Sequence, residues 1–287
     1  MNNIKYFLPK TLEEAVKYLS ENNDAKVLAG GTDLIVKWKK TGLPDMHLMD
    51  IRGIDNFGKI YELPGGLFIG AGATIEQIES CEKIKKCYPI LSEAASKVAS
   101  VQVRNLATVG GNSCNAAPSA DTVLPLIVYG AEAVIISTSG ERSCLLKDFF
   151  TGPGKTVMAP GEMLKGFMLP KPNAFTTASF AKHSRRAGMD LATVGVAVSL
   201  CVNKKEDKKA KDILIALGAV GPIPVFVKGL EKFDGADIFS DKIIEEIAEL
   251  SCSQASPISD IRGSKDYRSK MIRQNVKDCI CQALKTD

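Results

Sequence analysis

The chain lacks the features that mark several specialised classes of protein. No apolar run approaches the roughly 20 residues needed to cross a bilayer, and the N-terminal segment has no signal-peptide pattern. The net charge is only +4 over 287 residues, and aromatic residues make up 6%. Those aromatics do not interleave with basic runs, as they do in many nucleic-acid-binding surfaces. We therefore expect a cytoplasmic protein that binds neither membrane nor nucleic acid.

Close cysteine pairs are also missing. The eight cysteines include no Cys-x-x-Cys, although four-cysteine iron–sulfur sites usually show at least one tight pair. Cys279 and Cys281 lie in a segment with helical periodicity, where residues two apart face different sides. The two histidines, His47 and His183, are distant in sequence. We predict no metal site, and we expect the cysteines to be mostly buried thiols.

What the chain does contain is typical of a globular protein. Hydrophobic residues make up 45% and charged residues 24%, and this length can bury a large core divided over two or three units. One dense basic run, residues 204–209, also contains acidic residues. This run predicts a solvated hairpin turn rather than a nucleic-acid patch.

Two glycine pairs are the most informative feature. Gly30 with Gly31, and Gly110 with Gly111, each follow a short apolar run and precede a small polar residue. Glycine can adopt positive φ and bring its N–H group against an anion, and successive N–H groups form an anion-binding concavity. Two such turns suit a ligand with two phosphates, such as a dinucleotide. Neither turn fits a standard nucleotide fingerprint, so an ordinary tight turn stays an alternative for each pair alone.

Hydrophobic periodicity predicts a mixed architecture. Residues 11–22 read as an amphipathic helix that begins with a capping box at Thr11 and Glu14. Pro170 and Pro172 resemble a linker, beyond which an antiparallel sheet with helices on one face is expected. Strands are predicted at 26–29, 48–51, 67–71, 133–137, 142–146, 163–169, 175–182, 193–202 and 213–220. Further helices are predicted at 32–40, 92–100, 240–251 and 264–284.

Five segments resemble one flavoprotein family. They are VLAGGTDL (27–34), QVRNLATVGGNSCNAAPSAD (102–121), FFTGPGKT (149–156), FAKHSRRAGMDLATVGVAV (180–198) and IRGSKDYRSKMI (261–272). The chain resembles the FAD subunit of molybdenum hydroxylases, which include xanthine dehydrogenase and carbon monoxide dehydrogenase, and looks closest to bacterial xanthine dehydrogenase FAD subunits. The resemblance implies an α+β fold with a vanillyl-alcohol-oxidase (PCMH)-type FAD-binding domain over 1–173, of two α/β subdomains (about 1–55 and 56–173). A C-terminal α+β domain of the CO dehydrogenase flavoprotein type would follow over 174–287.

The resemblance also implies a set of cofactor-binding residues and no catalytic side chain. The first glycine turn would wrap the FAD pyrophosphate, the second would supply another backbone contact, and Asp121 would bind the ribose or a nearby flavin group. Lys182 would place a cation near the flavin and tune its potential. The implied residues are Val27, Leu28, Ala29, Gly30, Gly31, Thr32, Asp33, Leu34, Val98, Thr108, Val109, Gly110, Gly111, Asn112, Asp121, Leu164 and Lys182.

The implied function is electron relay through non-covalent FAD. Electrons would leave a molybdopterin cofactor on a large subunit, pass through [2Fe-2S] clusters on a small subunit, reach FAD on this chain, and go to NAD⁺ or another acceptor. A heterotrimer is the expected assembly. Two alternatives stay open: a stand-alone flavin oxidase or reductase of the same fold, and a non-catalytic nucleotide-binding module.

A charged loop between two predicted strands is the last candidate feature. Residues 183–190 contain two arginines, an aspartate and a glycine, and loops carry function more often than the scaffold does. In the family this loop lies close to the flavin, where an acceptor would approach. The alternative is a structural ion pair between Arg186 and Asp190.

Overall fold

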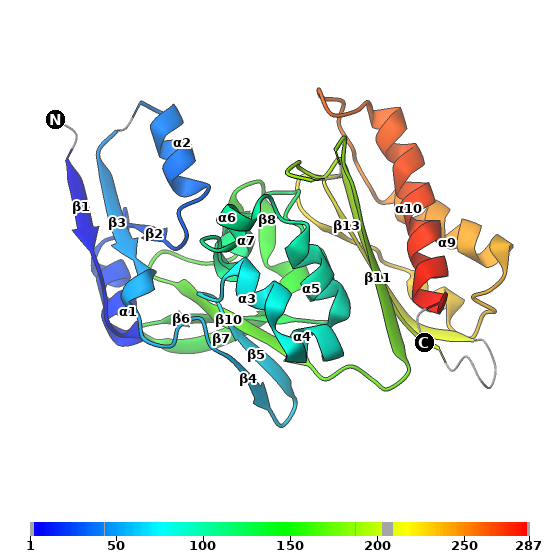
Figure 1. The fold of residues 1–287 in the computed structure, drawn as a ribbon, viewed down its shortest axis with the longest axis horizontal. Helices are drawn as coiled ribbons and strands as arrows, with labels where there is room; N and C mark the ends of the chain where they lie inside the picture. The colour runs from blue at the N-terminus through cyan, green and yellow to red at the C-terminus, as the bar shows by residue number, and fades with distance from the viewer. Residues whose placement is uncertain (1–2, 43, 187, 203–208, 286–287) are drawn as a thin grey trace.

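The three larger β-sheets lie one after another along the long axis of the molecule (Figure 1). The computed structural model describes residues 3–42, 44–186, 188–202 and 209–285. The chain runs through the sheets in order, from an N-terminal three-stranded sheet to a central five-stranded sheet and a C-terminal four-stranded sheet. The predicted hairpin turn at 204–209 falls almost wholly outside the described residues.

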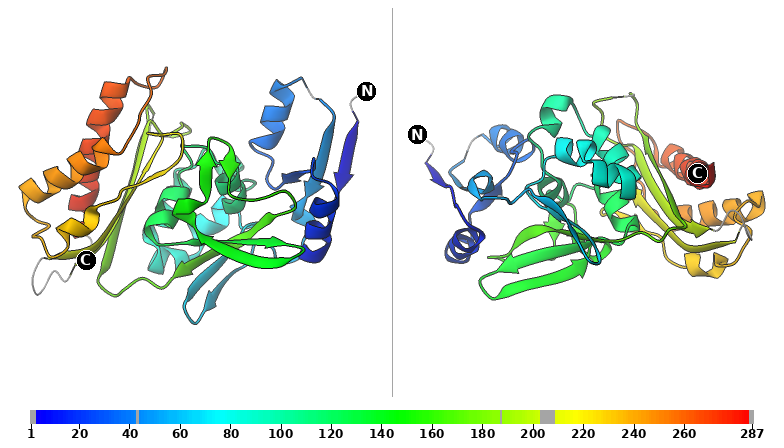
Figure 2. Two further views of the ribbon diagram at one scale, coloured as in Figure 1. Left: turned by 180° about the vertical axis from the view of Figure 1, so that it is seen from behind. Right: turned by 60° about the horizontal axis from the view of Figure 1, so that its bottom comes forward.

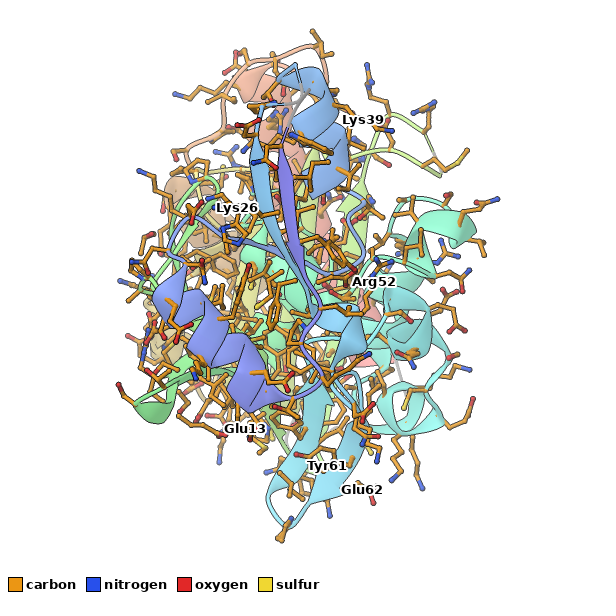
Figure 3. The ribbon with its side chains drawn as sticks, turned by 90° about the vertical axis from the view of Figure 1, so that its left-hand side faces the viewer. Glu13, Lys26, Lys39, Arg52, Tyr61 and Glu62 are labelled. Atoms are coloured by element: carbon orange, nitrogen blue, oxygen red, sulfur yellow. The ribbon has the colours of Figure 1, made fainter. Side chains whose placement is uncertain are left out.

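The N-terminal sheet is parallel and carries a helix after each of its first two strands. Its strands have the order β1 (Ile4–Phe7), β3 (Met46–Asp50), β2 (Lys26–Leu28), and its helices are α1 (Leu12–Glu21) and α2 (Leu34–Lys40). Figure 3 views the molecule along its long axis from the side of this sheet, with Glu13 on α1 near the bottom and Lys39 on α2 near the top. Parallel strands connected through helices are the βαβ arrangement, in which ligands meet the carboxyl ends of the strands.

Helix α1 begins as predicted, but only half of the capping box forms. The Thr11 hydroxyl accepts the Glu14 N–H at 3.2 Å. The Glu14 carboxylate instead accepts the N–H of Lys10 at 2.7 Å. The apolar side of α1 then buries Ala15, Val16 and Leu19, as its helical spacing predicts.

The central sheet is antiparallel, with helices against it on the side facing the viewer in Figure 1. Its order is β4 (Ile60–Leu63), β5 (Gly66–Gly70), β10 (Met163–Pro170), β6 (Glu132–Ser137), β7 (Gly140–Leu145). A short pair, β8 (Phe150–Gly152) and β9 (Lys155–Thr156), stands apart. The helices of this part are α3 (Ile75–Ser80), α4 (Glu82–Cys87), α5 (Pro89–Ser96), α6 (Val101–Arg104), α7 (Val109–Cys114) and α8 (Val123–Val128).

The C-terminal sheet is covered on both faces. Its antiparallel strands are β11 (Thr176–His183), β12 (Val194–Val202), β13 (Ala210–Gly218) and β14 (Val225–Phe226). Helices α9 (Asp241–Ser253) and α10 (Lys265–Lys285) lie on the outer side (Figure 2), while α5 and α8 contact the inner side. Strand β12 therefore reads as a continuous apolar run, as strands buried on both faces do. Ala197 packs into the central core and its neighbours Val196 and Val198 into the C-terminal core.

The predicted α+β fold is confirmed, but the sequence did not predict several short elements, and others differ slightly in bounds. The elements that were not predicted are β1, β4, β8, β9, β14, α3, α4, α6, α7 and α8. Helix α2 starts at Leu34 rather than at residue 32, and α5 ends at Ser96 rather than at residue 100. The predicted domain boundary at 173–174 falls between β10 and β11 and stays a prediction. Within the described part of the chain, no helix is both long and apolar enough to cross a bilayer.

Candidate functional site

The first glycine turn leaves a row of main-chain donors free. It follows β2 and precedes α2, and Gly31 adopts a φ of +69°, which favours glycine. The Gly31 carbonyl accepts the N–H of Ile35 at 3.0 Å. The N–H groups of Gly30, Gly31, Thr32 and Asp33 have no acceptor among the described residues. Four adjacent donors can bind an anion without any cationic side chain.

The second glycine turn uses its donors differently. The hydroxyl of Thr108, the N-cap of α7, accepts the Gly111 N–H at 2.9 Å. Val109 and Gly110 donate to carbonyls of the loop after β5, and Asn112 donates to the Thr108 carbonyl at 2.9 Å. In the described structure, the Thr108 N–H is the one in this turn without a protein acceptor. The expected backbone contact to FAD therefore stays a prediction, with Thr108 as its free donor.

Close backbone packing explains why both turns contain glycine. A Cβ on Gly30 would lie 1.9 Å from the Leu106 carbonyl oxygen, and one on Gly110 would lie 2.6 Å from the Ala71 carbonyl oxygen. A Cβ on Gly111 would lie 3.8 Å from the Ala29 Cβ. The two turns, about 80 residues apart in sequence, therefore pack against each other.

Asp121 and Lys182 form a buried ion pair. The Lys182 Nζ lies 2.7 Å from the Asp121 Oδ2 and also donates to the Lys97 carbonyl at 2.8 Å. Both side chains are at least nine-tenths buried. Burial raises the pKa of Asp121 to about 6, against the opposing effect of the Lys182 ammonium. Val98, which was predicted from the sequence, directly follows Lys97 and therefore lies beside the Asp121–Lys182 ion pair.

One hydrogen bond connects the second turn with the ion pair. The Thr122 hydroxyl donates to the Asn112 Oδ1 at 2.7 Å, and Thr122 directly follows Asp121. Leu164 is buried on β10 at a register shift of that strand, and the next carbonyl, of Lys165, accepts the Ala71 N–H. Val27 and Leu28 lie in β2, just before the first turn. The predicted residues therefore lie in one connected region, in which some are in contact and others are joined through one neighbouring residue such as Thr122.

The charged loop 183–190 joins β11 to β12 and adjoins the ion pair. It lines a cavity of about 250 Å³ together with Lys97 and Lys182. The Nε atoms of both Arg185 and Arg186 lie 3.7 Å from the Asp190 Oδ2. The Arg186–Asp190 ion pair that was the alternative interpretation of this loop is present, and Asp190 shares it with Arg185. The Asp190 Oδ2 is buried and accepts no hydrogen bond from the described residues.

Comparison with known proteins assigns the family. Residues 2–172 match the family described as "FAD binding domain in molybdopterin dehydrogenase" and residues 179–283 match the "CO dehydrogenase flavoprotein C-terminal domain". The chain belongs to this FAD-binding family. It is an FAD subunit of the molybdenum hydroxylase type, an oxidoreductase subunit, and the predicted resemblance is confirmed.

Relatives match over nearly the whole chain. The xanthine dehydrogenase FAD-binding subunit of Escherichia coli O157:H7 is 31% identical over 97% of this chain and 95% of that protein. The carbon monoxide dehydrogenase medium chain of Hydrogenophaga pseudoflava is 31% identical over 96% and 95%. A solved structure of the carbon monoxide dehydrogenase of Hydrogenophaga pseudoflava, which lacks the Mo-pyranopterin moiety, superposes with a TM-score of 0.92. Its identity is 30%, and it covers 98% of this chain and 97% of that one.

The sequence did not identify the backbone partners of this FAD subunit's site. Gly30 packs against the backbone of Leu106, and Gly110 packs against the backbone of Ala71. Lys182 donates a hydrogen bond to the Lys97 carbonyl, so this partner is a main-chain atom as well. A carbonyl can be supplied by any residue type, so these positions have no signal in a single sequence. The pairing of Asp121 with Lys182 likewise joins residues 61 apart in sequence.

Removal of the Thr108 hydroxyl tests how the second turn is held. We expect Thr108→Ala to lower the free energy of unfolding by about 1 kcal/mol, because the Gly111 N–H loses its cap. Urea unfolding measures the change, and Thr108→Ser, which keeps the hydroxyl, is the matched control. Equal stability of the alanine variant and the wild type would contradict a capping role.

Proposed function

We propose that the first glycine turn of this FAD subunit holds the pyrophosphate of non-covalent FAD. The observation that supports it most directly is the row of four unpaired N–H groups from Gly30 to Asp33 in the described structure. Hydrogen bonds to a charged group each contribute about 1.5–3 kcal/mol, so four suffice without a lysine. The residues present therefore fit the group.

The remaining residues of the site would orient the rest of the cofactor. Thr108 offers one N–H, and Asp121 offers its Oδ1 atom, which no protein group in the described structure occupies. Lys182 holds a positive charge beside that carboxylate. Cys114 on α7 is the cysteine closest in sequence to the second turn, and burial raises its thiol pKa to about 12. A thiol that stays protonated is a poor nucleophile, which supports non-covalent binding.

We further propose that the chain relays electrons within a larger complex. Bound FAD would supply the redox chemistry, taking electrons singly from [2Fe-2S] clusters and giving them in pairs to NAD⁺ or another acceptor. The partners would be a molybdopterin-binding large subunit and a [2Fe-2S] small subunit, as suits a chain related to proteins named medium chains. This chain's residues would bind the cofactor, exclude water and hold a cation. The cavity at 183–190 is the proposed approach for the acceptor.

The absorption spectrum of the purified chain tests cofactor binding. We expect a flavin spectrum with one FAD per chain, and full release of FAD on denaturation because no covalent bond holds it. Anaerobic addition of NADH to the same sample tests the acceptor, with bleaching of the flavin band expected and NADPH as the comparison. A colourless chain that cannot be reconstituted with FAD would exclude the proposal, and FAD retained after denaturation would exclude non-covalent binding.

A further inference from the structure

A buried carboxylate fixes one arginine close to the first glycine turn. Asp50 ends β3 and is 1% exposed. Arg52, which is labelled in Figure 3, lies on the 3₁₀-helix η1 (Ile51–Gly53) directly after β3. The Arg52 Nε donates to the Asp50 Oδ1 at 2.9 Å, and the Arg52 Nη2 donates to the Asp50 Oδ2 at 2.5 Å. Two parallel hydrogen bonds of this kind hold a guanidinium in one orientation.

Two further hydrogen bonds keep that carboxylate in place. The Tyr6 hydroxyl donates to the Asp50 Oδ2 at 2.7 Å, and the main-chain N–H of Arg52 donates to the Asp50 Oδ1 at 3.0 Å. Burial acts to raise the pKa of Asp50, but the hydrogen bonds from Arg52 and Tyr6 outweigh it and hold that pKa below its ordinary value. Asp50 is therefore an ionised anchor, and it sets the orientation of Arg52 before any ligand arrives.

The other end of the Arg52 guanidinium faces solvent. The side chain is 60% exposed, although its Nε and Nη2 atoms both donate to Asp50. Its Nη1 atom has no acceptor within the part of the chain that the structure describes. A guanidinium held in this way presents a preorganised, charged donor for an oxyanion.

The pairing of β2 with β3 puts this arginine next to the first glycine turn. Leu28, the last residue of β2, is the register partner of Asp50. The turn and η1 therefore leave adjacent strands at the same end of the sheet, and neighbouring strands lie about 4.8 Å apart. Strand β2 also contacts η1 directly. The two segments are thus neighbours beyond the carboxyl ends of the strands, where ligands bind in such sheets.

The glycine turn lies on the face of the sheet that carries Asp50. Register partners on adjacent strands point to the same face, so the side chains of Leu28 and Asp50 share one face. A Cβ on Gly31 would lie 3.0 Å from the Leu28 Cδ1, which places the turn against that face. Helix α1 covers the other face, where the Tyr18 hydroxyl bonds the ring of His47. The arginine and the free N–H groups of the turn can therefore contact one ligand.

The lysines near the turn in sequence lie at the wrong ends of their elements. Lys26 begins β2, so it is at the end of that strand away from the turn. The basic residues of α2 lie in its last turn, again at the far end; they are Lys37, Lys39 and Lys40. The four main-chain N–H groups supply hydrogen bonds but no net charge, whereas a pyrophosphate is a dianion. Arg52 is placed to supply the missing positive charge.

We infer that Arg52 binds a phosphate oxygen of the FAD pyrophosphate through its Nη1 atom, with Asp50 as its positioning residue. This inference rests on the proposed function, and it adds one charged side chain to a site otherwise made of main-chain donors. Arginine suits the role because it stays charged and matches the geometry of oxyanions. A purely structural ion pair would fix η1 to β3 and would not contribute to cofactor affinity.

Fluorescence titration of the apoprotein with FAD tests the inference. We expect Arg52→Met to weaken FAD binding by about 10- to 100-fold, as loss of one charge-assisted hydrogen bond implies. ADP, which has the pyrophosphate but no flavin, should lose the same factor as a competitor of FAD. Arg142→Met is the matched control, because Arg142 holds Glu162 through the same two nitrogens at 2.7 and 2.6 Å and is 44% exposed. Arg142 lies on β7, so this variant should keep wild-type affinity for both ligands.

A double variant separates cofactor binding from folding. Arg52→Met leaves the Asp50 carboxylate buried without its partner, which is destabilising, whereas replacing both members of a buried pair is often nearly neutral. Asp50→Asn combined with Arg52→Met should therefore melt close to the wild type and show the same weakened FAD binding. Wild-type FAD affinity in the double variant would overturn the inference. Weaker FAD binding with unchanged ADP competition would also overturn it, because the effect would then lie at the flavin end. Failure of the wild-type chain to bind FAD would instead overturn the proposed function.

Discussion

Replacing Lys182 with methionine is expected to lower the free energy of unfolding by about 3–5 kcal/mol, the usual cost of breaking a buried ion pair. The change keeps the length and apolar stem of the side chain. It leaves the Asp121 carboxylate buried without the ammonium that now lies 2.7 Å away. It also leaves the Lys97 carbonyl without its donor. Urea unfolding monitored by circular dichroism measures the loss.

The pH dependence of that loss identifies its cause. The folded-state pKa of Asp121 is about 6, above its ordinary value of 3.8, so its contribution to stability is fullest at low pH and is lost as pH rises through 6. Without Lys182 the pKa rises further. The deficit of Lys182→Met should therefore be larger at about pH 8 than at about pH 5. Equal deficits at both values would contradict this account.

A double variant provides the control for packing. Adding Asp121→Asn to Lys182→Met removes the uncompensated charge while keeping the volume. We expect it to recover most of the lost stability at about pH 8, because replacing both members of a buried pair is often nearly neutral. A double variant as unstable as the single one would place the cost in packing instead.

Local signals in the sequence were enough to predict much of the fold. The longer strands and helices follow from periodicity, whereas helices of only four to six residues, such as α3, α6 and α7, are too short to show it. The glycine pairs mark two turns because glycine is the residue that tolerates close backbone approach. The apolar spacing of α1 and the continuous apolar run of β12 correspond to burial on one face and on two faces, respectively. These features depend on residues near one another in the chain.

The contacts that assemble the site depend on residues far apart, and a single sequence does not encode them visibly. Gly30 meets a carbonyl near residue 106, and Lys182 meets Asp121. The two glycine pairs look alike in sequence, yet one turn leaves its N–H groups free of acceptors in the described structure and the other uses them for its own helix cap and neighbours. The family resemblance indicated which residues matter but not how they divide these roles.

Replacing Gly30 with alanine is the sharpest test of the first turn. Its Cβ would lie 1.9 Å from the Leu106 carbonyl oxygen and 2.4 Å from the carbonyl carbon, shorter than real Cβ contacts. Because the obstacle is backbone on both sides, the two turns must separate. We expect the free energy of unfolding to fall by about 3 kcal/mol, at the upper end for overpacking. We expect FAD affinity, measured by fluorescence titration of the apoprotein, to fall about a hundredfold, as loss of two charge-assisted bonds implies.

Substitutions at two other glycines are controls that separate the steric effect of Gly30→Ala from changes in backbone entropy and from backbone strain. A Cβ added to Gly65 would have no described neighbour within 4 Å, and its φ is not left-handed, so Gly65→Ala should be neutral or stabilising by up to about 1 kcal/mol. Gly31→Ala meets only flexible side chains at 3.0 Å and beyond but keeps a φ of +69°, which costs about 1–2 kcal/mol. FAD affinity should therefore be highest in Gly65→Ala, lower in Gly31→Ala and lowest in Gly30→Ala. If Gly30→Ala bound FAD as tightly as Gly65→Ala, the packing of the two turns would not position the free N–H groups, and the pyrophosphate site would have to lie elsewhere.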